Sequence, residues 1–156
     1  MLSLCYTWYQ KGAGKQFQVP TRWSSKGRLN LIGSLSLFGQ EERLEVRELQ
    51  GSCDQAQVIA YLETLVKSCN PKRISVVVLD NATFHKGVAL QERRADWEAR
   101  GLFLRYLPAY CPQLNLIEGV WRKLKGFLMH RRCYDTLEQL RQALHTALNA
   151  IGAITI

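Results

Sequence analysis

Apolar and polar residues alternate in two stretches near the start of the chain. The first runs from Arg28 to Phe38, and the second runs from Arg43 to Leu49, where Leu44 and Val46 alternate with charged residues. The dipeptide Gln40-Glu41 lies between the two stretches, where a turn is expected. This period of two predicts a β-hairpin with one buried and one solvated face.

Further along the chain, apolar residues recur at helical spacing. Ser52 and Gln55 match a capping box, and Asn70-Pro71 ends the helix that this box begins. A second helix is expected from about Val88 to Arg100, and a last one begins at Asp135-Thr136. The side chains expected to face the core are Val58, Ile59, Leu62, Leu65 and Val66 in the first helix and Leu137, Leu140, Leu144, Leu148 and Ile151 in the last.

A different pattern runs from Ile74 to Leu79, where a β-branched apolar run shows no alternation. Such a run predicts a strand covered on both faces, as in a parallel or mixed central sheet. Asp80 follows at the carboxyl end of this strand, which is where reactive groups gather in open α/β sheets. The plainer alternative is that Asp80 and Asn81 only turn the chain, because both side chains bond local backbone readily.

A loop with two prolines connects a strand expected at Leu102–Leu107 to a short basic helix. Apolar residues at helical spacing follow the loop, namely Ile117, Val120, Trp121, Leu124 and Leu128, and Trp121 is expected to pack in the core rather than stack on bases. Glu118 lies beside this stripe, with Arg122 and Lys125 beyond it on one face. A carboxylate followed by cations suits a metal site beside nucleic acid, whereas an ordinary surface ion pair is the plainer interpretation.

The predicted order of hairpin, helix, strand, helix, strand and helix is an α/β arrangement. With 156 residues, of which 47% are hydrophobic, the chain has the composition of one globular domain. Its 21 Lys and Arg against 13 Asp and Glu give a net charge of +8, which favours a polyanionic partner. Residues 1–40 lack acidic side chains and interleave basic with aromatic ones, as in a loop that contacts nucleic acid or a flap that packs on the sheet.

The five cysteines are widely spaced and form no Cys-x-x-Cys pair, which argues against a disulfide framework or a zinc site and fits a reducing cytosol. The first residues lack the basic segment and the cleavage site of a secretory signal. No apolar run approaches the length of a membrane span, so that a membrane partner is not expected.

Two motifs together resemble a known family. The first is Asp80-Asn81-Ala-Thr-Phe-His85, and the second runs from Leu107 to Lys125 as Leu-Pro-Ala-Tyr-Cys-Pro-Gln-Leu-Asn-Leu-Ile-Glu-Gly-Val-Trp-Arg-Lys-Leu-Lys. They resemble the second and third acidic motifs of the DDE-superfamily endonucleases and, more narrowly, of bacterial insertion-sequence transposases related to the Tc1/mariner group. The combination is far more specific than any single short motif.

The resemblance implies an RNase H-like fold, with a mixed sheet flanked by helices, that cleaves and transfers DNA strands. It implies that Asp80 and Glu118 are catalytic ligands of two Mg²⁺ or Mn²⁺ ions, with Asp80 bridging them. Asn81, His85 and Asn115 match supporting positions, although His85 as a simple loop histidine is an equal alternative. The cations expected to bind phosphates are Arg122, Lys123, Lys125, Arg131 and Arg132. The implied partners are transposon ends and target DNA in the bacterial nucleoid, and a homodimer is left open.

The resemblance is incomplete at the start of the chain. In the family the first catalytic Asp lies on a strand before the one expected at Arg28–Phe38, whereas here no acidic residue precedes Glu41. We therefore expect a catalytic domain that is truncated at its N-terminus, lacks a helix-turn-helix and has little activity alone. Asp54 is the remaining acidic candidate, although a helix cap explains it. A non-catalytic DNA-binding remnant and an RNase H-like nuclease with another role are the alternatives.

Overall fold

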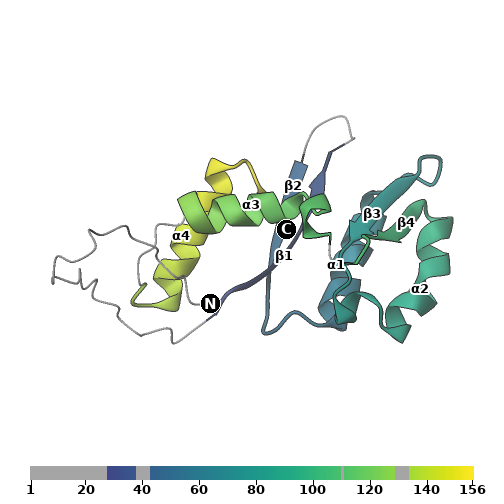
Figure 1. Ribbon diagram of the computed structural model, residues 1–156, viewed down its shortest axis with the longest axis horizontal. Helices are drawn as coiled ribbons and strands as arrows, with labels where there is room; N and C mark the ends of the chain where they lie inside the picture. Colours follow the sequence, from purple (N-terminus) through teal and green to yellow (C-terminus); the bar gives the residue numbers. More distant parts are fainter. Residues whose placement is uncertain (1–27, 38–42, 110, 129–133) are drawn as a thin grey trace, which may run out of the picture.

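The computed structural model describes residues 28–37, 43–109, 111–128 and 134–156 (Figure 1). The strands are β1 (Asn30–Ser36), β2 (Arg43–Leu49), β3 (Ser75–Leu79), β4 (Leu102–Tyr106) and β5 (Ile154–Thr155). The helices are α1 (Gln55–Ser68), α2 (Val88–Ala99), α3 (Ile117–Lys123) and α4 (Leu137–Ala150), with the short turns η1 (Thr83–His85), η2 (Pro112–Leu114) and the π-helical η3 (Leu124–Leu128). Sheets flanked by helices confirm the predicted α/β class.

The two stretches of alternating residues form the antiparallel hairpin of β1 and β2, as predicted. Leu35 lies opposite Leu44, and Gly33 lies opposite Val46. Leu44 and Val46 are buried, so that the alternation assigns the apolar face correctly. The turn expected at Gln40-Glu41 lies outside the described residues.

The opposite face of the hairpin, which was predicted to be solvated, packs on α1 through polar contacts. Ser34 Oγ lies 3.0 Å from Tyr61 Oη, and the Tyr61 hydroxyl donates to the Glu45 carbonyl oxygen over 3.1 Å. Arg47 Nη2 donates to Thr64 Oγ1 over 2.8 Å. The prediction of a solvated face is therefore wrong, because alternation identifies a polar face and such a face can also contact a helix.

The N-cap of helix α1 is Asp54, two residues after the predicted cap Ser52. The Asp54 backbone is extended, and its carboxylate accepts a hydrogen bond from the Gln57 N–H over 2.9 Å. Ser52 is exposed and lies before the cap, so that its predicted capping role is wrong. Asp54 outcompetes it because a side chain caps only the helix turn that directly follows it. Asp54 is thus a helix cap, as the plainer interpretation held.

Helices α1 and α2 cover one face of the parallel pair β3 and β4. The buried residues of this core are Val58, Leu62, Val66, Leu90, Trp97, Leu102 and Leu104. The predicted inward residues of α1 are confirmed, since three of them are in this core and Ile59 and Leu65 pack against it. Arg100 ends α2, and Gly101 adopts a φ of 89°, which favours glycine, before β4 begins.

The strands form two sheets instead of one central sheet. Strands β1, β2 and β5 form one sheet, and β3 and β4 form the other. In the described part of the chain, helix α1 links them: Tyr61 contacts β1 and β2, while Leu62 belongs to the core beneath β3 and β4 (Figure 1). The two-residue β5, which pairs in parallel with β2, is too short for its period to predict it.

Strand β3 is covered on one face only among the described residues. Val77 and Leu79 pack on the core of α1 and α2. Ile74, Val76 and Val78 are 77%, 52% and 54% exposed. The prediction of two covered faces is therefore wrong for the described structure, because both helices that pack on this sheet lie on the same side.

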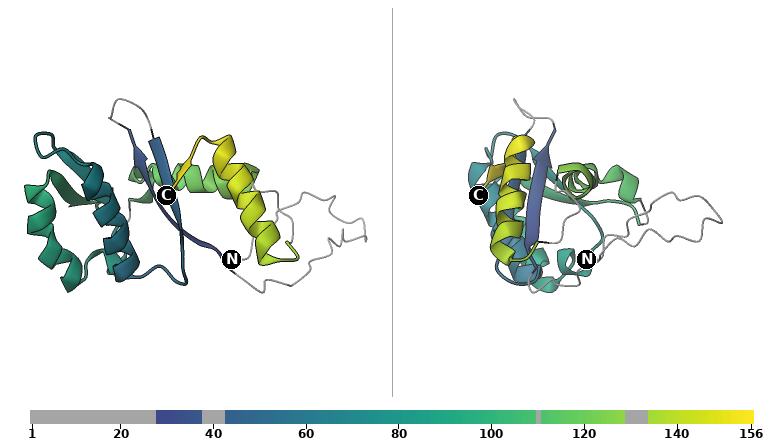
Figure 2. Two further views of the ribbon diagram at one scale, coloured as in Figure 1. Left: turned by 180° about the vertical axis from the view of Figure 1, so that it is seen from behind. Right: turned by 90° about the vertical axis from the view of Figure 1, so that its left-hand side faces the viewer.

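Helices α3 and α4 and the turn η3 pack on the apolar face of the hairpin (Figure 2). The buried residues of this second core are Leu44, Val46, Leu124, Leu144, Ala147 and Leu148, and the predicted stripe of Ile117, Val120, Trp121 and Leu128 packs against it. Trp121 lies directly over Gly33, where an added Cβ would be 3.0 Å from the Trp121 Cη2 atom. Gly33 therefore lets α3 approach β1 closely, and Trp121 is a packing residue, as predicted.

Three cysteines lie in the described part of the chain, and all three are free thiols: Cys53, Cys69 and Cys111. No helix among the described residues is long and apolar enough to cross a membrane.

Candidate metal and nucleic-acid site

Asp80 lies at the carboxyl end of β3, as its place in the sequence predicts. Its Oδ1 atom accepts the Ala82 N–H over 3.0 Å, which turns the chain away from the strand. The side chain remains 49% exposed. Asp80 can therefore both turn the chain and serve as a functional carboxylate, because the bond to Ala82 uses only one of its two oxygens.

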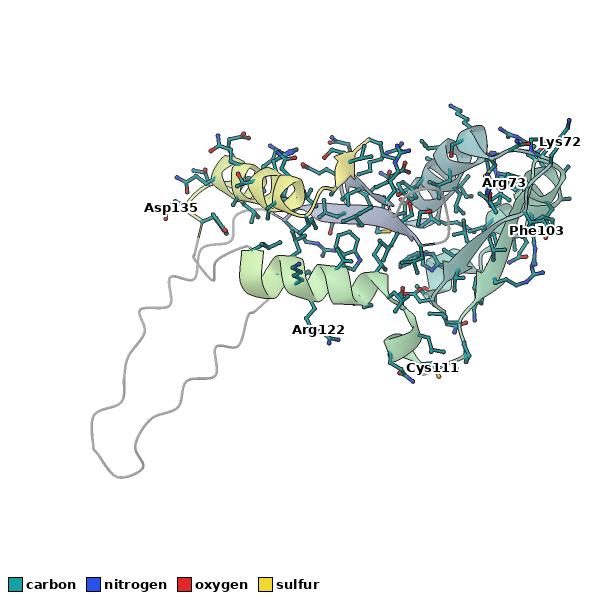
Figure 3. The ribbon with its side chains drawn as sticks, turned by 90° about the horizontal axis from the view of Figure 1, so that it is seen from above. Lys72, Arg73, Phe103, Cys111, Arg122 and Asp135 are labelled. Atoms are coloured by element: carbon teal, nitrogen blue, oxygen red, sulfur yellow. The ribbon has the colours of Figure 1, made fainter. Side chains whose placement is uncertain are left out.

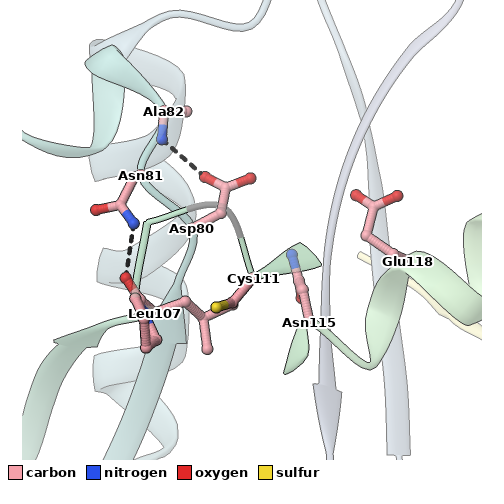
Figure 4. Close-up of a pocket in the computed structure, with 8 residues that line it drawn as sticks. Asp80, Asn81, Ala82, Leu107, Cys111, Asn115 and Glu118 are labelled. Atoms are coloured by element: carbon pink, nitrogen blue, oxygen red, sulfur yellow. Dashed lines mark hydrogen bonds between the residues drawn. The ribbon is translucent and has the colours of Figure 1, made fainter. Parts of the chain in front are cut away.

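The ends of β3 and β4 are tied together beside Asp80. The Leu107 N–H donates to the Leu79 carbonyl oxygen over 2.9 Å, which extends the parallel pairing by one bond. The Asn81 Nδ2 then donates to the Leu107 carbonyl oxygen over 2.6 Å (Figure 4). Asn81 thus holds the start of the proline loop next to Asp80, and this gives the predicted supporting residue a structural role.

Glu118 lies in the first turn of α3, where its side chain is exposed. Its N–H donates to the Asn115 carbonyl oxygen over 3.0 Å, which joins the helix to the preceding loop. Packing of Trp121 and Leu124 on the hairpin fixes the helix. Glu118 is therefore positioned by apolar contacts of its helix, while its carboxylate is left accessible.

Asp80, Asn81, Asn115 and Glu118 line one pocket of about 320 Å³. The other residues that line it are Ala82, Leu107, Pro108 and Cys111. The two carboxylates reach this pocket from opposite sides, with Asn115 between them (Figure 4). The structure thus brings together four predicted site residues that are up to 38 positions apart in the chain, 118 minus 80.

His85 is not one of the residues that line the pocket, but it contacts Asp80. Its Nδ1 atom lies 2.8 Å from Asp80 Oδ1 and 3.3 Å from the Asp80 carbonyl oxygen. The imidazole is 14% exposed. These contacts favour the supporting role for His85 over that of an unattached loop histidine.

The donors in this pocket fit a hard divalent cation. The two carboxylates supply the oxygen ligands that Mg²⁺ and Mn²⁺ prefer, and the side chains of Asn81 and Asn115 line the same pocket. Compared with roughly 30 Å³ per water molecule in the liquid, the pocket also has room for the waters that Mg²⁺ retains. Among the described residues, however, no three His, Cys, Asp or Glu side chains come close enough together to hold a metal.

Cys53 is a neighbour of Asp80 that the sequence analysis did not assign to the site. Burial raises the pKa of the Cys53 thiol, and the negative charges of Asp54 and Asp80 raise it further. The thiol is therefore held in its protonated form, which is a poor metal ligand. Cys53 and Asp80 are far apart in the sequence, and no sequence motif indicates that they lie close together.

Three of the predicted phosphate-binding cations follow Glu118 in α3 and in the adjoining η3. Arg122, Lys123 and Lys125 are exposed, and Arg122 projects away from the sheets (Figure 3). Arg131 and Arg132 lie outside the described residues. A run of cations next to a carboxylate-lined pocket gives a phosphate backbone a place to lie beside the pocket.

Comparison with known families identifies the chain. A family model described as DDE superfamily endonuclease matches residues 3–141, which include both acidic motifs and the whole pocket. The chain belongs to the DDE superfamily of endonucleases. Endonucleases of this superfamily act on DNA and generally use divalent metal ions. A search of curated proteins finds no match.

Proposed function

We propose that this DDE-superfamily chain is the catalytic domain of a transposase, which cleaves DNA and transfers the strand. One observation supports this most: Asp80, at the end of β3, and Glu118, at the start of α3, reach one pocket. The order of hairpin, α1, β3, α2, β4 and α3 also fits an RNase H-like catalytic domain with a mixed sheet. The proline loop from Pro108 to Asn115 favours a transposase over an RNase H-like nuclease with another role.

Asp80 and Glu118 hold the metal in this proposal, and Asn115 lies between them as a further oxygen donor or a phosphate contact. Two divalent ions supply the stabilisation of the attacking and leaving oxygens in phosphoryl transfer. The chain contributes the orientation of the ligands: Asn81 fixes the proline loop, and His85 contacts Asp80. Packing of α3 on the hairpin determines where Glu118 lies.

Arg122, Lys123 and Lys125 bind the phosphates of DNA in this proposal, together with Arg131 and Arg132 from the part that the structure does not describe. The DNA is that of transposon ends and targets in the bacterial nucleoid. The net charge of +8 supports such a polyanionic partner.

We further infer that this polypeptide has little cleavage activity by itself. Among the described residues that line the pocket, Asp80 and Glu118 are the only carboxylates, and Asp54 caps α1 instead of lining it. With only two carboxylates, the affinity for metal falls, and a reaction that needs two ions is affected more than binding.

A cleavage assay with purified protein tests this function. Supercoiled and end-labelled DNA are incubated with the chain and Mg²⁺ or Mn²⁺, alongside Asp80→Asn and Glu118→Gln. We expect DNA binding by all three proteins and no nicking above background. Robust nicking that either substitution abolishes would overturn the inference of inactivity while supporting the catalytic site. Absence of DNA binding would contradict the whole proposal.

A second candidate is a DNA-binding remnant without catalysis, which the two-carboxylate pocket favours. The two candidates differ in what the carboxylates do. In a remnant, Asp80→Asn and Glu118→Gln leave DNA affinity unchanged or raise it, whether or not metal is present, because they remove negative charge near the phosphates. In a catalytic domain, the same substitutions remove the increase in DNA affinity that Mg²⁺ gives. Affinity measurements with Mg²⁺ and with EDTA separate the two candidates.

A further inference from the structure

Two leucines next to the pocket have exposed side chains. Leu114 is 53% exposed, and Leu116 is 58% exposed. They flank Asn115, which lines the pocket between Asp80 and Glu118 (Figure 4). A single exposed leucine is common on a protein surface and needs no explanation. These two, however, each lie one residue from a side chain of the pocket, and we refer to them as the leucine pair.

Backbone hydrogen bonds hold the leucine pair in place. The Leu114 N–H donates to the Cys111 carbonyl oxygen over 3.1 Å, at the turn η2. The Leu116 carbonyl oxygen accepts the Gly119 N–H over 3.0 Å, and Leu116 has helical backbone angles, with φ −60° and ψ −30°. The helix that follows packs on the hairpin through Trp121. The leucine pair therefore stands on a backbone that is fixed at both residues, while its side chains are exposed.

Leu116 shares one face of α3 with a cation. Gly119 and Lys123 follow it at i+3 and i+7, which places the three residues on one side of the helix. Both are exposed, and nothing lies within 4 Å of a Cβ built on Gly119. At 1.5 Å per residue, Leu116 and Lys123 are about 10 Å apart along the helix, which equals about three steps of one DNA strand at 3.4 Å each. A base at Leu116 and a phosphate at Lys123 can therefore belong to the same strand.

Charge and size around the leucine pair favour a nucleic acid over a protein partner. From Leu107 to Lys125 the sequence has one acidic residue, Glu118, and three cations. Two leucine side chains expose far less area than the roughly 800 Å² that each partner contributes to a standard protein interface. They are large enough to contact one base step, and proteins that kink DNA commonly insert Leu, Ile, Phe or Met there.

We propose that Leu114 and Leu116 contact the bases of DNA next to the phosphate at the pocket, and that they unstack one base step. The DNA itself rests on the proposed function, to which the leucine pair adds a contact that neither the carboxylates nor the cations supply. The apolar side chains gain free energy by leaving water, and this gain offsets part of the cost of unstacking. That cost is smallest where bases are already mismatched. The chain should therefore bind a duplex with a mismatch more tightly than the same duplex without one.

The test uses the full chain, Mg²⁺ and short duplexes that carry 2-aminopurine beside either a normal base pair or a mismatch. The fluorescence of 2-aminopurine rises when the base is unstacked, and fluorescence anisotropy gives the affinity. The test variant combines Leu114→Ala with Leu116→Ala. Ile74→Ala is the matched control, because Ile74 is 77% exposed and lies before β3, at the end opposite Asp80. Thermal unfolding checks that both variants are folded.

We expect the fluorescence to rise when the wild type or Ile74→Ala binds, and the mismatched duplex to bind more tightly to both. The double variant should show no rise. Its affinity for the mismatched duplex should fall about 3- to 10-fold for each leucine, because each contact buries about half of a leucine side chain. Its salt dependence should stay unchanged, since that depends on the cations.

An equal rise in the double variant would overturn the proposal, and so would an equal loss of the rise in Ile74→Ala. If the wild type binds DNA without any rise, this proposal is wrong and the proposed function is not affected. If neither duplex binds, both are contradicted. If the double variant binds DNA like the wild type but loses self-association in sedimentation velocity, the leucine pair contacts another protein chain and the proposal is wrong.

Discussion

The two regions that build the pocket position their carboxylates by different means. In the region of α1, α2, β3 and β4, a hydrogen bond from the Ala82 N–H and a 2.8 Å contact with His85 Nδ1 orient the Asp80 side chain itself. In the region of the hairpin, α3 and α4, the helix that carries Glu118 is placed by apolar packing, and the Glu118 carboxylate is exposed. The Asp80 carboxylate is therefore held in one orientation, whereas the Glu118 carboxylate is free to adjust to what the pocket binds.

The two regions also differ in how completely they are packed. Trp97 is fully buried, and its Nε1–H donates to Glu63 Oε1 over 3.0 Å, so that α2 is fixed to α1. Trp121 is only partly buried and lies over Gly33. A substitution in one region should therefore displace the carboxylate of that region more than the carboxylate of the other. Substitutions in each region test this expectation.

The largest expected effect is that of Trp97→Ala. Because it empties the core below β3 and β4 and removes one of the donors to Glu63, we expect a loss of about 3 to 5 kcal/mol in the free energy of unfolding. Trp121→Ala should cost less, since that side chain is partly exposed. Urea unfolding measures both. A larger loss for Trp121→Ala would contradict the view that the Asp80 region is the better packed of the two.

A smaller effect is expected of Gly33→Ala, which displaces α3. Its Cβ would lie 2.8 Å from the Glu45 carbonyl oxygen and 3.0 Å from Trp121 Cη2, so that we expect a loss of about 1 to 3 kcal/mol and weaker Mn²⁺ binding. Gly119→Ala is the matched control, because nothing lies within 4 Å of its Cβ. It should leave stability unchanged or raise it by about 0.5 to 1 kcal/mol, as expected within a helix.

If both glycine variants weaken Mn²⁺ binding equally, the close approach of Trp121 to Gly33 does not position Glu118. Retained Mn²⁺ binding in a destabilised Gly33→Ala protein would lead to the same conclusion.

The smallest effects are expected from Glu63 and Glu48, two carboxylates that accept hydrogen bonds from neighbouring elements, one in each region. A hydrogen bond from Trp97 lowers the pKa of Glu63, with a smaller contribution from Arg93, and hydrogen bonds from Arg141 lower the pKa of Glu48. A carboxyl whose pKa is lowered by folding stabilises the protein above its unfolded pKa of 4.5, and this stabilisation is lost as the pH falls through its folded pKa.

We therefore expect the free energy of unfolding to decrease between about pH 5 and pH 3, and to decrease less steeply in Glu63→Gln and in Glu48→Gln. Thermal unfolding at several pH values measures this. Gln has nearly the same shape as Glu and carries no charge. Each variant removes one of the two lowered pKa values and leaves the other in place, so that each serves as the control for the other. An unchanged pH dependence in both would show that neither pair contributes.

Local patterns in the sequence predicted most of the elements because each depends on neighbouring residues. The period of two gave β1 and β2, and the apolar stripe gave α3 with Trp121 on its packed side. The start of α1 was misjudged because Ser52 and Asp54 both match cap preferences, and only the backbone shows which of them precedes the first helical turn. The exposure of Val76 and Val78 depends on which elements pack on β3, and no local pattern contains that information.

The candidate site was predictable to the extent that its residues lie in two motifs. Asp80, Asn81, Asn115 and Glu118 were expected to lie together, and the structure places them around one pocket. The contacts that hold Asp80 were less accessible. The Ala82 N–H follows from the usual Asp turn, but Tyr106 reaches His85 across 21 residues and only through the pairing of β3 and β4.

The central claim is that the two regions form one metal site, and Mn²⁺ broadening of amide NMR signals tests it most directly. Mn²⁺ added to the ¹⁵N-labelled chain should broaden the signals of Ala82 and Gly119 together, since these residues are neighbours of Asp80 and Glu118. Asp80→Asn should remove the broadening at both positions, and so should Glu118→Gln. Broadening at only one position, or broadening at both that persists in Asp80→Asn, would contradict a shared site.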